Sequence, residues 1–284
     1  MRNILLTLEY DGSRYQGWQR LGKGESTNTV SNKILEVLKK MTNEDVELFC
    51  GARTEVGVHA YGQVVNFKTT TDMTLLEIKH YMNRYLPMDI AVLSVEEKPE
   101  RFHASLNAKS RIYLYRVAIA EVPSVFDRKY TYHSFKKPDT ELMKQAALLL
   151  AGKHDFKKFS TVKKNKSTEK EILNIDIYED LEEIQITLEA TDFLHNMPRM
   201  ILSTCSISDL ASAARKKLTR FSLLLPLLWQ AHLAIRKALS AGSCLRSLKQ
   251  LGKVSCTVIL CTYFLNKSTI SVFTYYHRKG ASFL

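Results

Sequence analysis

The residues best suited to chemistry lie within residues 51–60, which read G-A-R-T-E-V-G-V-H-A. Arg53 and Glu55 are two residues apart where a strand-like run passes into a loop, and Gly57 then allows a sharp turn. An arginine near a carboxylate favours its ionised form, and it can also orient the carboxylate or bind a phosphate. An ionised carboxylate can act as a nucleophile or a general base. The alternative is a surface ion pair that closes the loop, since such pairs are common and contribute little stability.

The apolar pattern predicts the elements that position this segment. An apolar run at 46–52 leads into it, and a second run at 63–69 carries the chain away. Thr71 or Asp72 is available as the N-cap of a following helix, and Pro87 is expected to end that helix. The expected helices span 29–41 and 74–86, and the remaining strands span 3–10 and 90–95. The order strand–helix–strand–strand–helix–strand is that of a ferredoxin-like unit.

A second unit of sheet and helix is expected to begin near residue 106. A helix at 140–150 has Gly152 as a C-cap, and two strands at 170–178 and 182–190 alternate as a hairpin does. The sequence therefore predicts an α+β fold of two ferredoxin-like (RNP-like) units, with antiparallel sheets that flank a central cleft. A cleft between units is the usual place for a site. The expected domains are 1–105, 106–201 and an atypical segment, 202–284.

Two further segments combine basic and aromatic residues. Residues 11–20, D-G-S-R-Y-Q-G-W-Q-R, are expected to form a loop, and residues 109–116, K-S-R-I-Y-L-Y-R, alternate like a strand. Tyr113 and Tyr115 then share one side of that strand. Basic side chains suit phosphates and aromatic rings suit bases, so both segments favour nucleic acid. The alternatives are an ordinary aromatic-packed turn and a half-exposed strand.

These segments resemble a known protein family. R-T-E-x-G-V-H-A at 53–60 is similar to the R-T-D-x-G-V-H-A signature of the TruA family of tRNA pseudouridine synthases. The resemblance covers about 200 of the 284 residues. Further stretches resemble that family in the same order along the chain: residues 10–19 (Y-D-G-S-R-Y-Q-G-W-Q), 102–104 (F-H-A), 154–159 (H-D-F-K-K-F) and 193–201 (F-L-H-N-M-P-R-M-I).

The resemblance implies an activity and a substrate. TruA-type enzymes convert selected uridines of the tRNA anticodon stem-loop to pseudouridine, replacing an N–C glycosidic bond by a C–C bond. They use neither a metal nor an organic cofactor. They act as homodimers, with one tRNA touching both chains. An isomerase that binds tRNA is therefore expected.

The resemblance also assigns roles to individual residues. Glu55 occupies the position of the catalytic aspartate and is one methylene longer. Arg53 and Arg199 are expected to hold Glu55 ionised and in place, and Tyr113 is expected to stack on the uracil and act as acid or base. Pro198 departs from the family's pattern, within a stretch that is expected to lie on a helix. The expected substrate-binding residues are Arg20, His59, Lys109, Arg111 and His195.

Charge and cysteine usage change abruptly near residue 202. The net charge of +12 suggests a polyanion partner, but residues 1–201 hold 29 Lys and Arg against 28 Asp and Glu. Residues 202–284 hold 12 Lys and Arg against one acidic residue, and they contain four of the five cysteines. A reading-frame shift near Leu202 would explain both changes, and the alternative is a basic C-terminal extension that binds RNA. Because Asp209–Phe221 and residues 229–239 both back-translate into family-like sequence in one shifted frame, the shift is favoured.

Composition narrows the cellular setting. Five cysteines without a signal peptide indicate a reducing cytoplasm, and the absence of a C-x-x-C pair argues against a zinc site. No apolar run reaches about 18 residues, so no membrane span is expected. His59 and His103 lack clustered partners, which favours structural or phosphate-contacting roles over metal binding. Two alternatives to the enzyme remain: a tRNA-binding relative that lost its chemistry at Glu55, and an inert truncated relic.

Overall fold

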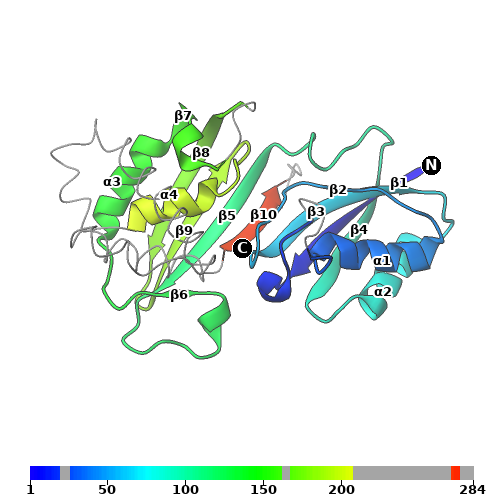
Figure 1. Ribbon diagram of the computed structural model, residues 1–284, viewed down its shortest axis with the longest axis horizontal. Coiled ribbons are helices and arrows are strands. Elements are labelled where there is room, and N and C mark those ends of the chain that lie inside the picture. The colour runs from blue at the N-terminus through cyan, green and yellow to red at the C-terminus, as the bar shows by residue number, and fades with distance from the viewer. Residues whose placement is uncertain (20–25, 162–166, 207–269, 276–284) are drawn as a thin grey trace, which may run out of the picture. The chain divides into compact units, whose positions relative to one another are not determined.

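The chain forms two compact units, whose boundary falls inside strand β5 (Ser110–Ala118). The computed structural model of the 284-residue chain describes residues 1–19, 26–161, 167–206 and 270–275 (Figure 1). Of the described residues, the first unit comprises 1–19, 26–114, 189–191 and 270–275, and the second comprises 115–161, 167–188 and 192–206. The chain is a mixed α/β protein with antiparallel sheets, as the sequence predicts.

The first unit is built on an antiparallel sheet. β1 pairs with both β3 and β4, and β2 pairs with β3, so the strand order is β4–β1–β3–β2. β10 (Ile270–Tyr275) also lies beside β3 and runs parallel to it. The other elements are β1 (Arg2–Tyr10), α1 (Val30–Thr42), β2 (Leu48–Cys50), β3 (His59–Thr69), α2 (Leu75–Tyr85) and β4 (Ile90–Lys98).

Local signals set the ends of the two helices. The Thr29 side chain accepts a hydrogen bond from the backbone of Asn32 and so begins α1. α2 begins with a capping box, in which Thr74 and Glu77 each accept a hydrogen bond from the other's backbone N–H. The predicted cap at Thr71 or Asp72 is therefore wrong, because Thr74 has the partner at the right spacing. α2 ends before Pro87, as predicted.

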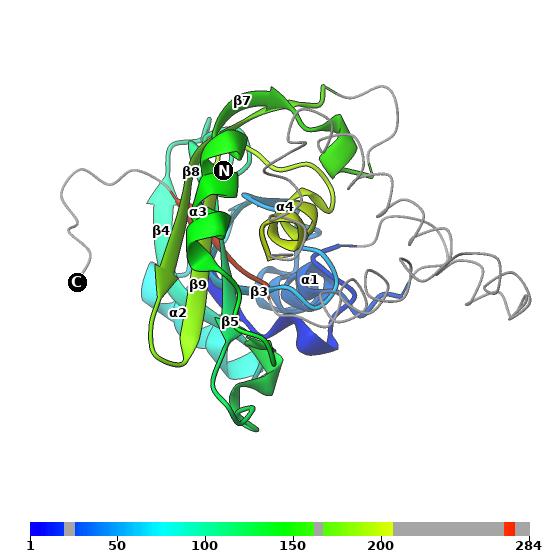
Figure 2. The same cartoon turned by 90° about the vertical axis from the view of Figure 1, so that its left-hand side faces the viewer.

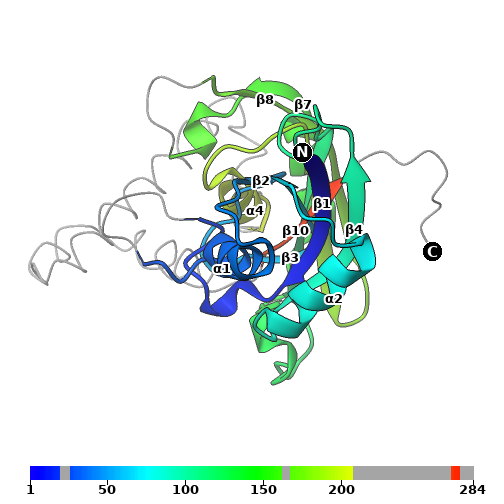
Figure 3. The same ribbon diagram turned by 90° about the vertical axis from the view of Figure 1, so that its right-hand side faces the viewer.

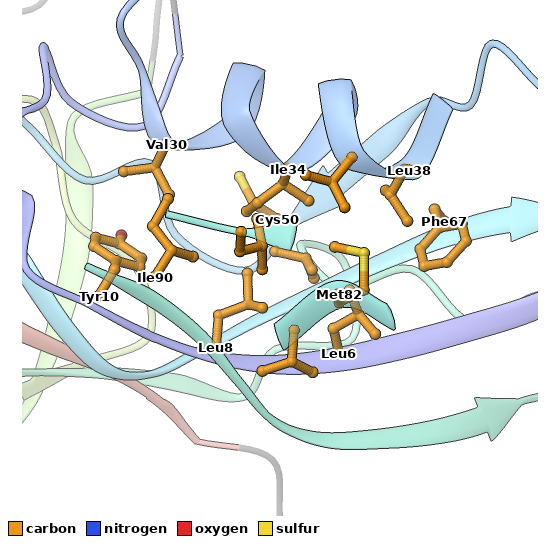
Figure 4. Close-up of a cluster of buried hydrophobic side chains, with 14 of the residues drawn as sticks. Leu6, Leu8, Tyr10, Val30, Ile34, Leu38, Cys50, Phe67, Met82 and Ile90 are labelled. Atoms are coloured by element: carbon orange, nitrogen blue, oxygen red, sulfur yellow. The ribbon is translucent and has the colours of Figure 1, made fainter. Parts of the chain in front are cut away.

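Both helices bury an apolar side against the same face of the sheet (Figure 3). Ile34 and Leu38 of α1, and Met82 of α2, are fully buried beside Leu6 and Phe67 of the strands (Figure 4). Each such side chain contributes roughly 1.5–3 kcal/mol when it leaves water. This core fixes β1 and β3, and the loops at their ends carry the segments that the sequence predicts to be functional.

Side chains of α2 bond to the outer edge of β4. The Asn83 amide donates to the carbonyl of Val92 (2.9 Å), and its oxygen accepts from the Val92 N–H (2.7 Å). The Lys79 ammonium donates to the neighbouring carbonyl of Leu93 (2.6 Å). Because β4 has β1 on its other side, these bonds satisfy backbone groups that no described strand reaches.

The second unit contains a hairpin of β8 and β9, the latter beside the C-terminal half of β5, and two helices. The side chain of Asp139 begins α3. The C-cap is Ala151 rather than the predicted Gly152, which has φ of 92° and begins β7. α3 packs on β8 and contacts α4 (Figure 2). The elements are β6 (Tyr132–His133), α3 (Thr140–Leu150), β7 (Gly152–Asp155), β8 (Glu169–Glu179), β9 (Glu183–Ala190) and α4 (Met197–Ser206).

The helix expected over 193–201 begins later than predicted. α4 starts at Met197, so residues 193–196 precede it. Asn196 has φ of 63° and its carbonyl accepts the first helical hydrogen bond, from Met200 (3.1 Å). Pro198 therefore lies in the first turn, where its missing N–H costs nothing.

Candidate active site

Arg53 and Glu55 share one side of an extended segment. Ala52 and Thr54 are buried, whereas Arg53 is exposed and Glu55 is half-buried. This alternation is typical of extended backbone, in which successive side chains point to opposite sides. The segment, residues 51–58, joins β2 to β3 and is hereafter called the catalytic segment, after the role that the sequence predicts for Glu55. It turns sharply at its end, where Glu55 O accepts from Val58 N (3.2 Å) and Gly57 has φ of 74°.

A buried glutamine anchors the start of the catalytic segment. Gln63 of β3 is fully buried, its side-chain oxygen accepts from Ala52 N (3.3 Å), and its amide donates to the Ala52 carbonyl. One residue earlier, Gly51 N donates to Val64 O (2.8 Å). The Gln63 side chain thus takes the place of a strand partner just where β2 ends.

The loop over residues 11–18 packs directly on the catalytic segment. Trp18 N donates to Thr54 O (2.9 Å), and the hydroxyls of Tyr10 and Thr54 are 2.7 Å apart. A Cβ on Gly12 would lie 2.0 Å from Val58 O. Two segments that the sequence singled out separately are therefore in contact. Glycine is required at position 12 because any larger residue would collide with the backbone of the segment.

His59 lies inside the first unit, between the loop and the catalytic segment. It is 5% exposed, and its Nδ1 is 3.2 Å from Gly12 N and 3.0 Å from Asp11 Oδ1. The neutral ring accepts from Gly12, whereas the protonated ring donates to Asp11. Nδ1 therefore contacts the loop, and the expected role of His59 in substrate binding stays a prediction.

Tyr113 lies on the buried side of β5. The predicted alternation is confirmed: Tyr113 and Tyr115 are buried, and Ile112 and Leu114 on the other side are half-buried. Burial raises the pKa of Tyr10 far above its usual value, and the nearby Tyr113 adds to that increase. Tyr113 is therefore close to Tyr10, whose hydroxyl contacts Thr54 of the catalytic segment.

Positive charge gathers near the start of the catalytic segment. Burial raises the pKa of the Cys50 thiol to about 11, while the charge of Arg53, a hydrogen bond from it, and the charge of Arg111 oppose this increase. Both arginines thus lie close to Cys50. Of the expected phosphate contacts, Lys109 is exposed, whereas Arg111 is only 8% exposed.

The Arg111 guanidinium bonds to three backbone carbonyls. Its Nε donates to Gly51 O (2.7 Å), its Nη1 to Thr191 O (2.7 Å) and its Nη2 to Ser105 O (3.3 Å). All four residues belong to the first unit. The guanidinium thus contacts backbone carbonyls of the first unit, and the expected role of Arg111 in substrate binding stays a prediction.

Two buried asparagines hold the R-F-H-A segment, and sequence reasoning missed them. Asn66 Oδ1 accepts from Ala104 N (2.8 Å), and its amide donates to Asn3 Oδ1 (2.9 Å). Asn3 in turn donates to Phe102 O (2.9 Å). His103 has a structural role here, since its Nδ1 accepts from the N–H of Ser105 (3.2 Å). A polar residue within an apolar strand, such as Asn66 or Gln63, is the signal that could have revealed these anchors.

The remaining predicted site residues lie outside the first unit or outside the described residues. Arg199, half-buried, and His195, exposed, belong to the second unit. The segment that carries them is fastened by Thr161, whose N–H donates to His195 O (3.3 Å) and whose hydroxyl accepts from the Asn196 amide (3.0 Å). Arg20 lies in 20–25, which the structure does not describe.

Within residues 1–19, 26–161, 167–206 and 270–275, no helix is long and apolar enough to span a membrane. In the same part of the chain, no three His, Cys, Asp or Glu side chains gather as a metal site would need.

Comparison with known proteins identifies the family. The model of the tRNA pseudouridine synthase family matches residues 7–107 and 146–245. The tRNA pseudouridine synthase A 2 of Bacillus cereus strain ATCC 14579 is 42% identical over 203 residues, which are 71% of this chain and 82% of the relative. The tRNA pseudouridine synthase A of Bacillus sp. strain KSM-64 is 43% identical over 205 residues (72% and 83%). The tRNA pseudouridine synthase A 2 of Clostridium perfringens strain 13 is 41% identical over 208 residues (72% and 83%). The chain therefore belongs to the TruA family of tRNA pseudouridine synthases.

Proposed function

We propose that this chain is a TruA-type isomerase that converts uridine to pseudouridine in the anticodon stem-loop of tRNA. The observation that supports this most directly is the catalytic segment, whose backbone is held on both sides while Arg53 and Glu55 face away from the core. A fixed backbone with an ionisable pair on its open side is what a positioned carboxylate requires.

The reaction needs one well-placed carboxylate. The bond between uracil N1 and ribose C1′ breaks, and a bond between C5 and C1′ forms. C5 then loses a proton and N1 gains one, so the product has the same atoms as the substrate. Glu55 attacks the ribose or the base, or removes the C5 proton, and Arg53 holds it in place. The proposed mechanism uses neither a metal nor an organic cofactor.

The other residues prepare the base and the tRNA backbone. The target uridine must leave the helix stack, which costs a few kcal/mol. Tyr113 stacks on the extruded uracil and exchanges a proton with it. Lys109, which is exposed, contacts a phosphate. From the second unit Arg199 supports Glu55 and His195 binds tRNA, and Arg20 is a further phosphate contact.

The finer architecture belongs to the same proposal. The order β4–β1–β3–β2, all antiparallel, with both helices on one face, supports a ferredoxin-like first unit. The second unit is proposed to be its counterpart, with a cleft that carries the site. A homodimer acting in the cytoplasm follows from the family resemblance, and light scattering of the purified protein tests the dimer.

The activity is tested with an anticodon stem-loop transcript labelled with tritium at uracil C5. Pseudouridine formation releases that label, and filter binding of the same RNA measures affinity. Release of label by the wild-type protein supports the proposal. Tight binding without release would overturn it in favour of a tRNA-binding relative that lost its chemistry at Glu55. Neither binding nor release would indicate the inert relic.

We propose further that the reading frame changes near Leu202. The break in charge and cysteine usage at this position supports it, and the relatives match over only about 200 residues. The family model, however, matches residues 146–245 and so continues past Leu202, which counts against the shift; codons 195–245 are therefore the stretch to resequence. A single-base insertion or deletion there supports the shift, and an uninterrupted frame overturns it in favour of a real basic extension.

A further inference from the structure

We propose that Arg111 is a positioning residue, which fixes the catalytic segment against the strand that carries Tyr113. This inference rests on the proposed function, and it replaces the contact with the tRNA backbone that the sequence suggests for this side chain.

Each of those carbonyls opens or closes a segment that resembles the family. Gly51 begins the catalytic segment, four residues before Glu55. Ser105 directly follows R-F-H-A, and Thr191 lies two residues before F-L-H-N. The donor–acceptor distances are 2.7, 3.3 and 2.7 Å, respectively. One side chain therefore ties together three segments that are far apart in the sequence.

Arg111 also shares a side of β5 with Tyr113. Both residues are 8% exposed, and they are two positions apart on one strand, which places their side chains on the same face. The Nε bond to Gly51 thus sets the distance between the strand of Tyr113 and the segment of Glu55. In catalysis, a displacement of about 1 Å can reduce the rate by about 10²-fold.

Arginine has the shape that this task requires. The guanidinium is a rigid plane with five N–H donors, so it can serve three acceptors in fixed directions. A lysine at the same place has three donors around one point and cannot span the same separation. Burial also opposes a phosphate contact, because Arg111 is 8% exposed while nearby Lys109 is open to solvent.

The test compares Arg111→Gln with Lys109→Gln. For R111Q we expect kcat to fall roughly 10- to 100-fold, since a misplaced segment lowers the rate. We expect its Kd for the stem-loop, and the dependence of that Kd on salt, to stay near wild type. For K109Q we expect a weaker Kd and a salt slope smaller by about one, which marks a lost phosphate contact. A weaker Kd, a smaller salt slope and an unchanged kcat in R111Q would overturn the proposal.

Hydrogen exchange separates positioning from a general loss of stability. In R111Q we expect faster amide exchange in peptides covering 51–58, 102–107 and 189–191, with the peptide covering α1 unchanged. Equal acceleration in α1 would show a merely structural role. If R111Q does not fold, Arg111→Lys is tested instead, with the same expected results. If R111K does not fold either, the role of Arg111 is structural and the proposal is overturned. Amide exchange can be measured without catalytic turnover. An inactive wild-type protein would therefore contradict the proposed function, while the exchange measurement would still test whether Arg111 positions residues 51–58.

Discussion

The hydroxyl groups of Tyr10 and Thr54 lie 2.7 Å apart in the buried interior of the first unit. Tyr10 is the last residue of β1, directly before the D-G loop, and Thr54 stands between Arg53 and Glu55. One hydrogen bond therefore joins the end of a core strand to the middle of the catalytic segment. Stability of the core and geometry of the site are coupled at this point.

Removing either hydroxyl should destabilise the protein by a similar amount. We expect Tyr10→Phe and Thr54→Val each to lower the free energy of unfolding by about 1 kcal/mol, the typical contribution of one hydrogen bond. The double variant should cost clearly less than the sum of the two, because the second substitution has no bond left to remove. Urea denaturation of the four proteins measures this. Fully additive losses would show that the two hydroxyls are not coupled.

The carboxylate of Glu55 should be needed for turnover and dispensable for folding. Glu55→Gln keeps the size and removes the charge, so we expect kcat to fall by roughly 10²- to 10⁴-fold, the usual contribution of a positioned acid or base. The free energy of unfolding should change by no more than about 0.5 kcal/mol, since the side chain is half-exposed. Glu55→Asp is the matched control: it retains the charge and should release label measurably. Wild-type rates in E55Q would remove Glu55 from the mechanism.

Two glycines near the site should respond differently to a methyl group. Gly12→Ala would place a Cβ 2.0 Å from Val58 O, so the loop and the catalytic segment must separate. Gly57→Ala meets nothing within 4 Å, and its cost comes only from φ of 74°, about 1 kcal/mol. We expect G12A to lose more stability than G57A, and to lose activity as well. Equal midpoints in urea would contradict the close packing described here.

The Cys50 thiol should make stability fall in alkaline solution. Its pKa is raised from 9.0 to about 11 by burial, so below pH 9 the thiol is protonated in both the folded and unfolded states and its contribution is complete. Between pH 9 and 11 the unfolded state ionises first, and roughly 1–3 kcal/mol of stability is lost. The free energy of unfolding of wild type minus that of Cys50→Ala, measured across this range, isolates the thiol. A difference independent of pH would refute the shift.

The strands and helices up to residue 201 were predictable because their apolar patterns are strong. The N-cap of α2 was also within reach: T-L-L-E at 74–77 has the spacing of a capping box, which Thr71 and Asp72 lack. The buried side of β5 was harder to predict. Both of its faces are rich in large side chains, so only the packing of the folded chain decides that the tyrosines point inward.

The site was less predictable than the fold, for a physical reason. Glu55 and Arg53 carry a recognisable local pattern, but the anchors that hold them are side chains bonded to distant backbone. Gln63 reaches back 11 residues to Ala52, and Arg111 reaches back 60 to Gly51. Every residue carries the same backbone carbonyl, so a hydrogen bond from a side chain to distant backbone produces no characteristic spacing of residue types in the sequence. For this reason the loop contacts of His59 and the carbonyl contacts of Arg111 could not be predicted from the sequence.

The bonds from α2 to the outer edge of β4 have a consequence for how copies of the chain behave at high concentration. A bare strand edge is a template onto which a strand of another molecule can add, and repeated addition leads to β-aggregates. The Asn83 amide occupies both backbone groups of Val92, and the charge of Lys79 covers the next carbonyl. An incoming strand would have to displace them and bury an ammonium. The first unit therefore carries its own protection against edge-to-edge polymerisation, built from two side chains of a helix that also buries Ile78 and Met82 in the core.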